Sequence, residues 1–228
     1  MTASIRPELV IFDVDGTLQD TFLWWPDIIR DGVQRFAKQT GLVLAEPGFD
    51  LACSVVGMRD EGVWAPFLPV GEKHRWRDLR ALVLPMEDAI MRSGTSFLFP
   101  GVPEVLRSLR GLGVRTALAS NCRSTYMAAL REGQGLAALT EWQFCLDSPG
   151  VSTKADMLAE AFLAAGTTRA VMVGDREPDQ SAAKAHGIPF VWRENTRCAI
   201  PDADAVWRGG VDELLRLLGF SEYPESNP

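Results

Sequence analysis

Two aspartates follow the first apolar run of the chain, two positions apart. The run is Leu9-Val10-Ile11-Phe12, and it predicts a buried strand over Leu9–Val14 that carries Asp13 and Asp15 at its end. Alternate residues of an extended chain share a face, so both carboxylates can approach one ligand. Neighbouring carboxylates repel each other, so one can hold a proton while the other stays an anion. The pair therefore suits a nucleophile and a general acid/base, although Asp and Gly also form ordinary turns.

Polar side chains also follow later apolar runs. Ser120 and Asn121 come after one predicted strand, Lys154 opens a predicted helix, and Asp175 and Asp179 come after another strand. Each signal is weak by itself, because Ser and Asn cap helices and acids favour the first helical turn. The carboxyl ends of parallel strands, however, meet at one edge of a sheet, where ligands bind. Together these residues indicate an anion site beside carboxylate oxygens of the kind that Mg²⁺ prefers.

The second half of the chain alternates short apolar runs with segments of helical period. Strands are predicted over 114–119, 143–146, 170–173 and 188–192, and helices over 105–112, 125–130, 155–165, 178–185 and 211–218. Such alternation is typical of βα repeats with parallel strands. We therefore expect an α/β fold with a Rossmann-like, doubly wound parallel sheet, to which the strand Leu9–Val14 also belongs.

About 80 residues without a convincing strand separate the first strand from this alternation. Two helical faces occur there, over 28–37 and 79–90. We expect a helical insert over residues 21–99, and a core made of residues 1–20 plus 100–228 whose last residues, 221–228, form a loose tail. Trp24 and Trp25 are expected to pack inside the insert or to form the wall of a pocket.

The composition disfavours several classes of function. The chain has 228 residues and a net charge of −7, which disfavours the phosphate neutralisation on which nucleic-acid binding depends. No apolar run is long enough to span a bilayer. Four dispersed cysteines and two histidines disfavour a zinc ribbon, a disulfide framework and a His-rich metal site. We expect a soluble, cytoplasmic protein without a nucleic-acid or membrane partner; the oligomeric state is not indicated by the sequence.

The polar motifs, in their order along the chain, resemble those of the haloacid dehalogenase (HAD) superfamily. The motifs are Asp13–Leu18, Ser120-Asn121, Lys154 and the run Gly174–Asp179. The resemblance covers nearly the whole chain, because the helical insert occupies the place of the C1 cap of phosphoglycolate phosphatase-like members. It implies a HAD-like core with an inserted helical C1 cap, and an enzyme that hydrolyses phosphoric monoesters.

A mechanism is also implied by the resemblance. Asp13 would attack phosphorus and form an aspartyl-phosphate, which splits a slow hydrolysis into two easier steps. Asp15 would protonate the leaving alkoxide and then deprotonate the attacking water. Mg²⁺ would be the cofactor, held by Asp13, the Asp15 carbonyl and Asp175, with Asp179 in support.

The remaining polar residues would bind the substrate. Lys154 and Ser120 would neutralise charge on the phosphoryl group, and Thr17 and Asn121 offer a hydroxyl and an amide to the substrate. Arg59 falls in the loop region through which C1 caps reach the site. There it would hold a carboxylate or phosphate of the substrate, unless it is simply solvated. The expected substrate is a small phosphorylated metabolite over which the insert closes.

Other chemistries are compatible with some of these residues. A phosphomutase similar to β-phosphoglucomutase would use the same residues, whereas a phosphate-binding non-enzyme on this fold would be expected to lose Asp13 or Asp15. Cys53 and Arg59 have the C-x5-R spacing of cysteine-dependent phosphatases. Ala52 stands where that family has His, so we interpret Cys53 as an apolar residue of a cap helix. The sequence therefore favours a phosphatase that uses carboxylates.

Overall fold

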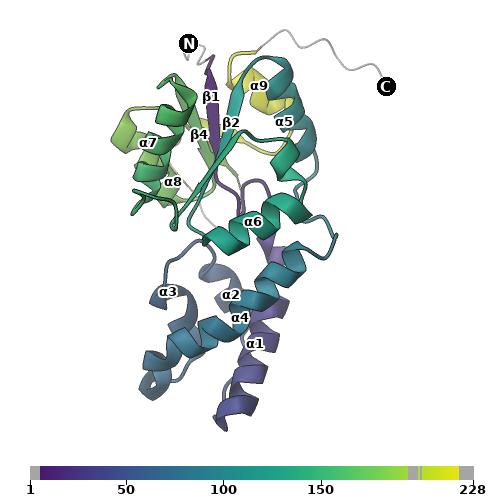
Figure 1. The fold of residues 1–228 in the computed structure, drawn as a ribbon, viewed down its shortest axis with the longest axis vertical. Helices are drawn as coiled ribbons and strands as arrows, with labels where there is room; N and C mark the ends of the chain where they lie inside the picture. The colour runs from purple at the N-terminus through teal and green to yellow at the C-terminus, as the bar shows by residue number, and fades with distance from the viewer. Residues whose placement is uncertain (1–5, 195–199, 201, 221–228) are drawn as a thin grey trace.

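The computed structural model describes residues 6–194, 200 and 202–220, and its strands form one parallel sheet. The predicted tail at 221–228 lies outside the described residues. Within the described part of the chain the sheet has six strands in the order β3-β2-β1-β4-β5-β6. The strands are β1 Leu9–Phe12, β2 Arg115–Ser120, β3 Trp142–Cys145, β4 Ala170–Gly174, β5 Phe190–Arg193 and β6 Ala205–Trp207. This order, with β1 in the middle, confirms the predicted doubly wound α/β fold (Figure 1).

Strand β1 is buried on both faces, as its unbroken apolar sequence predicts. Phe12 pairs with Leu118 of β2 and with Val173 of β4, so the residues after these three strands emerge at one edge of the sheet. The backbone N–H of Asp13 still donates to the carbonyl of Val173 at 2.9 Å. The pairing therefore brings the acids after β1 and β4 and the hydroxyl of Ser120 to the same place.

Helices cover both faces of the sheet (Figure 1). Val10 and Phe12 share an apolar cluster with one set of helices, and Leu9 and Ile11 share a cluster with the other. The first set is α5 Val102–Gly111, α6 Ser124–Gly133 and α9 Val211–Leu217; the second is α7 Lys154–Ala165 and α8 Glu177–His186. A short 3-10 helix, η4, covers Leu136–Ala138. The two-sided burial explains why β1 has no polar residue before Asp13.

The segment after β1 is helical, as expected from its periodicity. It contains the α-helices α1 Trp25–Thr40, α2 Phe49–Ser54, α3 Glu61–Trp64 and α4 Trp76–Met91, and the 3-10 helices η1 Thr21–Leu23, η2 Ala65–Phe67 and η3 Val70–Arg75. Helices α1 and α4 pack so closely that a Cβ on Gly32 would lie 2.4 Å from the Val83 side chain. We call residues 21–99 the helical insert; its limits stay a prediction.

The two ends of the helical insert meet beside β1. The backbone N–H of Phe99 donates to the carbonyl of Leu18 at 2.9 Å, and that of Asp20 to the carbonyl of Phe97 at 2.8 Å. Figure 1 shows the insert gathered beyond one end of the sheet, with α6 lying between the two. The chain therefore leaves and re-enters the core through two adjacent segments.

Several details differ from the predicted elements. Strand β6 was not predicted, since a run of three residues carries no usable period. Strand β5 begins at Phe190 because Ile188 still closes the end of α8, donating its N–H to the carbonyl of Ala183 at 3.1 Å. Strand β1 ends at Phe12 because the carbonyl of Val14 already accepts from the turn that follows. Among the described helices, none is long and apolar enough to cross a membrane.

Candidate active site

An acidic cluster lies at the carboxyl edge of β1 and β4. Asp13, Asp175 and Asp179 are all buried, and each offers a carboxylate oxygen within 4.8 Å of the others. Two glycines allow this approach. A Cβ on Gly16, where φ is +86°, would lie 2.4 Å from an oxygen of Asp175, and one on Gly174 would lie 2.4 Å from the Asp179 carboxyl carbon. Gly16 and Gly174 therefore leave the room that the carboxylates of Asp175 and Asp179 occupy.

Lys154 bridges two of these aspartates. Its Nζ donates to Asp13 Oδ1 at 2.7 Å and to Asp179 Oδ1 at 2.5 Å, and the three side chains are nearly inaccessible to solvent. Lys154 is the first residue of α7, which Thr153 and Asp156 cap with reciprocal hydrogen bonds. The cap fixes where the helix begins, and so fixes the origin of the lysine side chain.

The cluster holds more negative charge than its surroundings favour. Burial raises the pKa of Asp175 well above its ordinary value, and the charges of Asp13 and Asp179 raise it further. Burial also raises the pKa of Asp179 to about 6, although Lys154 opposes that shift. For Lys154, burial alone would lower the pKa, but Asp13 and Asp179 outweigh burial and raise it. Lys154, together with Arg176 at 3.6 Å from Asp175, thus compensates the three carboxylates only in part.

These residues fit a divalent cation of the Mg²⁺ type. Three convergent carboxylates are hard oxygen ligands, and their raised pKa values indicate that further positive charge would stabilise the ionised cluster. Thr17 is fully buried, and its hydroxyl donates to Asp175 Oδ1 at 3.4 Å. The side chain of Thr17 therefore supports the acidic cluster in this structure, while its predicted contact with substrate stays a prediction.

A cavity of about 70 Å³ opens directly above the cluster. Its lining includes the predicted catalytic residues Asp13, Asp15, Ser120 and Lys154 together with Asn121, Asp179 and Arg176, and Gly57 and Met58 of the helical insert close one side. A volume of this size suits a group as small as a phosphoryl group. The residues that the motifs singled out at four separate places in the sequence are thus brought around one small space.

Asp15 stands where this cavity meets a larger one. It lines both the 70 Å³ cavity and a chamber of about 260 Å³ between the core and the helical insert. Three side chains donate to its Oδ1: Thr21 at 2.6 Å, Gln19 at 2.8 Å and Tyr126 at 2.9 Å. A ligand that occupies both cavities would have its connecting atom at this boundary. A carboxyl group here is placed to exchange a proton with that atom.

The 260 Å³ chamber is walled by the helical insert. Trp24 and Trp25 are buried and also line the chamber, so they combine the two placements that the sequence left open, and Trp64 packs against Trp25. Arg59 lies at this chamber and donates to the carbonyl of Ser152 at 3.1 Å, so it bridges the insert to the loop before α7. Asn121 lines both cavities. The chamber is therefore the space available to the part of a ligand that lies beyond the small cavity.

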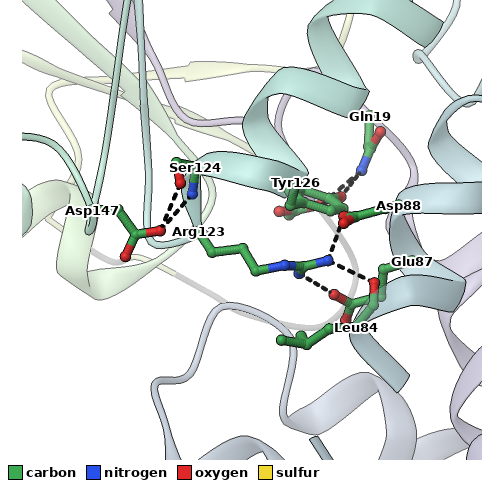
Figure 2. A network of polar contacts seen from close by, with 9 residues as sticks. Gln19, Leu84, Glu87, Asp88, Arg123, Ser124, Tyr126 and Asp147 are labelled. Carbon is green, nitrogen blue, oxygen red and sulfur yellow. Dashed lines mark hydrogen bonds and ion pairs between the residues drawn. The ribbon is translucent and has the colours of Figure 1, made fainter. Parts of the chain in front are cut away.

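An ion-pair network joins the helical insert to the core at the chamber wall (Figure 2). The guanidinium of Arg123, from the residue that precedes α6, donates to the carboxylates of Glu87 and Asp88 and to the carbonyl of Leu84, all on α4. Burial raises the pKa of Glu87 to about 7, and the Arg123 charge offsets only part of this effect. The network therefore contains a carboxyl group that is costly to ionise.

The raised pKa of Glu87 makes the stability of the protein depend on pH. Because the folded pKa of about 7 exceeds the ordinary value of 4.5, the folded state binds a proton in this interval that the unfolded chain does not. The contribution of Glu87 to stability is therefore full below pH 4.5 and is lost as the pH rises through 7. We expect Glu87→Gln to remove this loss, which amounts to about 1–3 kcal/mol. Urea unfolding at pH 5, 6, 7 and 8 measures it.

The matched control is Glu104→Gln, which changes an exposed glutamate of α5 that pairs with Arg107. The control is expected to keep the pH dependence of the wild type. If Glu87→Gln and the wild type lose the same free energy of unfolding between pH 5 and pH 8, Glu87 does not titrate in this interval.

Comparison with known proteins agrees with this geometry. The family model of haloacid dehalogenase-like hydrolases matches residues 7–187, which include every element that carries the site. The chain belongs to the haloacid dehalogenase-like hydrolase family. The resemblance stated from the motifs is thereby confirmed.

Two curated relatives are named after different activities. The tyrosine-protein kinase PtkA of Mycobacterium tuberculosis is 31% identical over 194 residues, which are 81% of this chain and 61% of the kinase. The phosphoglycolate phosphatase of Pseudomonas putida is 31% identical over 193 residues, which are 81% of this chain and 68% of the phosphatase. The chain thus spans about three fifths of the length of the kinase relatives that it matches.

Solved structures share the HAD fold over almost the whole chain. A predicted phosphoglycolate phosphatase from Haemophilus somnus superposes with a TM-score of 0.75 at 16% identity, covering 93% of this chain and 98% of that one. The agreement includes the helical insert, because both chains are covered nearly end to end.

Sequence reasoning missed several side chains of this HAD site. Arg176 was quoted within a motif but given no role, yet it lines the small cavity and pairs with Asp175 at 3.6 Å. Likewise, no role in the site was predicted for Gln19, Thr21 or Tyr126. A hydroxyl or amide next to a proposed acid was the available signal for Gln19 and Thr21, whereas no signal in the sequence pointed to Tyr126.

Proposed function

We propose that the protein is a Mg²⁺-dependent phosphatase that hydrolyses a small phosphate monoester through an aspartyl-phosphate on Asp13. The observation that carries the proposal is the 70 Å³ cavity, in which Asp13, Asp15, Ser120 and Lys154 face one space beside three clustered carboxylates. Curated relatives named as phosphoglycolate phosphatases support it at the level of the reaction class. Cys53, the alternative nucleophile, is buried in α2 of the insert, which supports a carboxylate nucleophile instead.

In the proposed first step, the Asp13 carboxylate attacks phosphorus and the bond to the leaving oxygen breaks. Lys154, in contact with Asp13, and Ser120 at the end of β2 stabilise the negative charge on the phosphoryl oxygens. Asp15, at the boundary of the two cavities, gives its proton to the departing alkoxide. In the second step Asp15 takes a proton from water as the water oxygen attacks phosphorus. The bond between phosphorus and the Asp13 oxygen breaks, inorganic phosphate leaves and the Asp13 carboxylate is restored.

Asp13, Asp175 and Asp179, with the carbonyl of Asp15, would hold the Mg²⁺ ion in this scheme. When bound, Mg²⁺ supplies Lewis acidity and screens the repulsion between an anionic nucleophile and an anionic substrate. Asp13 would serve both as nucleophile and as metal ligand, so the other ligands must lie next to it. This accounts for the density of acids at one sheet edge.

The helical insert would act as a cap in this proposal. The 260 Å³ chamber would accept the leaving group of a small phosphorylated metabolite, with Asn121 and Arg59 in contact with the substrate. Gly57 of the insert lies against Arg176 of the core, where a Cβ would be 3.2 Å from the arginine side chain. A cap in this position excludes bulk water from the reaction. A cytoplasmic location stays a prediction.

The experiment that tests the proposal is turnover of a panel of small phosphate esters, including nitrophenyl phosphate and phosphoglycolate, with and without Mg²⁺. We expect Mg²⁺ to support release of inorganic phosphate, and excess chelator to lower kcat by about 10³-fold or more, because two anions must react without screening. Undiminished turnover by extensively chelated, metal-free protein would contradict the metal dependence. Transfer of the phosphoryl group to a protein tyrosine, with none to water, would contradict hydrolysis.

A further inference from the structure

Helix α6 touches both the helical insert and the proposed acid/base. Figure 1 shows α6 lying between the sheet and α4. Residues at the N-terminal end of α6 form hydrogen bonds with partners on either side. Arg123 precedes its first turn, and Tyr126 lies within that turn. These two residues have no part in the mechanism described so far.

Arg123 fastens the insert to the core. Its side chain is 14% exposed and donates to three acceptors, which are the carboxylates of Glu87 and Asp88 and, at 2.7 Å, the carbonyl of Leu84 (Figure 2). All three acceptors belong to α4 of the insert. The guanidinium donates from two nitrogens, Nη1 to Glu87 and Nη2 to Asp88 and Leu84, whereas a lysine ammonium donates from one nitrogen. Lysine would therefore keep the charge and lose the geometry.

Tyr126 connects this ion-pair network to Asp15. Its buried ring lies 5.7 Å from the Arg123 guanidinium, close enough for a cation–π contact. Its hydroxyl donates to Asp15 Oδ1 at 2.9 Å and accepts from the Gln19 amide at 2.6 Å. Burial, followed by the charge of Asp15, raises the pKa of Tyr126 well above its ordinary value, so the phenol stays protonated and remains a donor.

The other end of α6 also touches α4 but does not reach Asp15. There Gly133 packs against the Met91 carbonyl so closely that a Cβ would lie 1.7 Å from the oxygen. Arg92 pairs with Glu132 at 3.3 Å, and both side chains are about half exposed or more. Within the described part of the chain, two arginines therefore link the ends of α4 and α6, and of these two Arg123 is linked to the acid/base.

We propose that Arg123 and Tyr126 are positioning residues that couple the seating of the helical insert to the placement of Asp15. When α4 is seated on Arg123, the first turn of α6 is fixed and the Tyr126 hydroxyl holds the Asp15 carboxyl at the boundary of the two cavities. The kinetic consequence rests on the proposed function, because it assigns Asp15 the protonation of the leaving group. The structural coupling between Arg123 and Asp15 does not rest on it.

The kinetic test compares two esters that need the acid to different degrees. An alkoxide leaves only when protonated, whereas nitrophenolate is stable enough to leave as an anion. The value of kcat/KM reports on the steps up to departure of the leaving group. We expect Arg123→Lys and Tyr126→Phe each to lower kcat/KM about tenfold more for the best alkyl phosphate of the panel than for nitrophenyl phosphate. The double variant should lose little more than either single one.

Arg92→Lys is the matched control, because it makes the same change at the other arginine contact between α4 and α6. Its ratio of kcat/KM between the two esters should equal that of the wild type. A ratio in Arg123→Lys equal to the wild type, or an equal loss for both esters, would overturn the coupling, since a purely structural defect does not select for the leaving group.

A second measurement needs no turnover. The ¹³C resonance of the Asp15 carboxyl, assigned with Asp15→Asn, should shift in Arg123→Lys as it does in Tyr126→Phe, and should stay in place in Arg92→Lys. An unmoved resonance in Arg123→Lys would refute the coupling even if the protein is an active phosphatase. A shifted resonance in a protein that hydrolyses no ester would instead support the coupling and refute the proposed function.

Discussion

Replacing Asp13 by asparagine is expected to lower kcat for nitrophenyl phosphate by about 10⁴-fold or more while the protein stays folded. An amide carries no negative charge and cannot form an acyl phosphate, so both the nucleophile and the first half of the reaction are lost. Folding should survive because Lys154 keeps its contact with Asp179 at 2.5 Å, and because one of three repelling carboxylates becomes neutral. Steady-state kinetics and thermal unfolding of the same preparation measure the two effects.

Asp212→Asn is the control for this substitution, since Asp212 is an exposed residue in the first turn of α9. It should leave kcat unchanged. A kcat of Asp13→Asn within tenfold of the wild type would show that another group attacks phosphorus. Cys53 would then be examined by Cys53→Ser, which our mechanism expects to be nearly silent.

Replacing Lys154 by methionine is expected to damage stability as well as activity. The lysine is the cation that touches Asp13 and Asp179, so its loss leaves buried carboxylates uncompensated, at a cost of about 3–5 kcal/mol in metal-free protein. The substitution also removes the ammonium that would neutralise the negative charge of the phosphoryl oxygens. The value of kcat should therefore fall by about 10²–10³-fold even when Mg²⁺ is present. Thermal unfolding in chelator and in Mg²⁺, followed by kinetics, measures both effects.

Mg²⁺ provides an internal check on the Lys154 prediction. If the loss of stability comes from uncompensated carboxylates, Mg²⁺ should raise the Tm of Lys154→Met by more than it raises the Tm of the wild type. Lys184→Met, at an exposed position of α8, should behave like the wild type in both conditions. Equal Mg²⁺-dependent shifts in Lys154→Met and wild type would mean that the lysine does not compensate this cluster.

The acidic half of the site could be predicted because strand ends carry its residues. Apolar runs locate β1 and β4, parallel strands share one carboxyl edge, and so Asp13 and Asp175 had to meet once the fold class was identified. The local sequence predicts the site role of Lys154 and Asp179 less well, because lysines and acids at the start of a helix are common in proteins without such a site. They became predictable through the order of the motifs, and the structure brings both into contact with each other.

The partners of Asp15 could not be predicted, because they depend on contacts between distant segments. Tyr126 lies 111 positions away from Asp15, and a helical period says only which residues of α6 face inward. The same limit applies to Arg123 and α4, where a surface arginine and a surface acid have no visible partner in the sequence. Gln19 and Thr21 are close in sequence, but their direction depends on the turn after β1, in which three N–H groups converge on the Val14 carbonyl.

The most direct test of the mechanism asks whether Asp13 carries a phosphoryl group during turnover. The protein is mixed with nitrophenyl phosphate and Mg²⁺, quenched in acid within the first turnovers, reduced with borohydride and digested for mass spectrometry. An aspartyl-phosphate is reduced to homoserine, so our mechanism predicts homoserine at position 13 in the wild type and none in Asp13→Asn. Continued turnover with unmodified Asp13, or with the phosphoryl group on another residue, would contradict it.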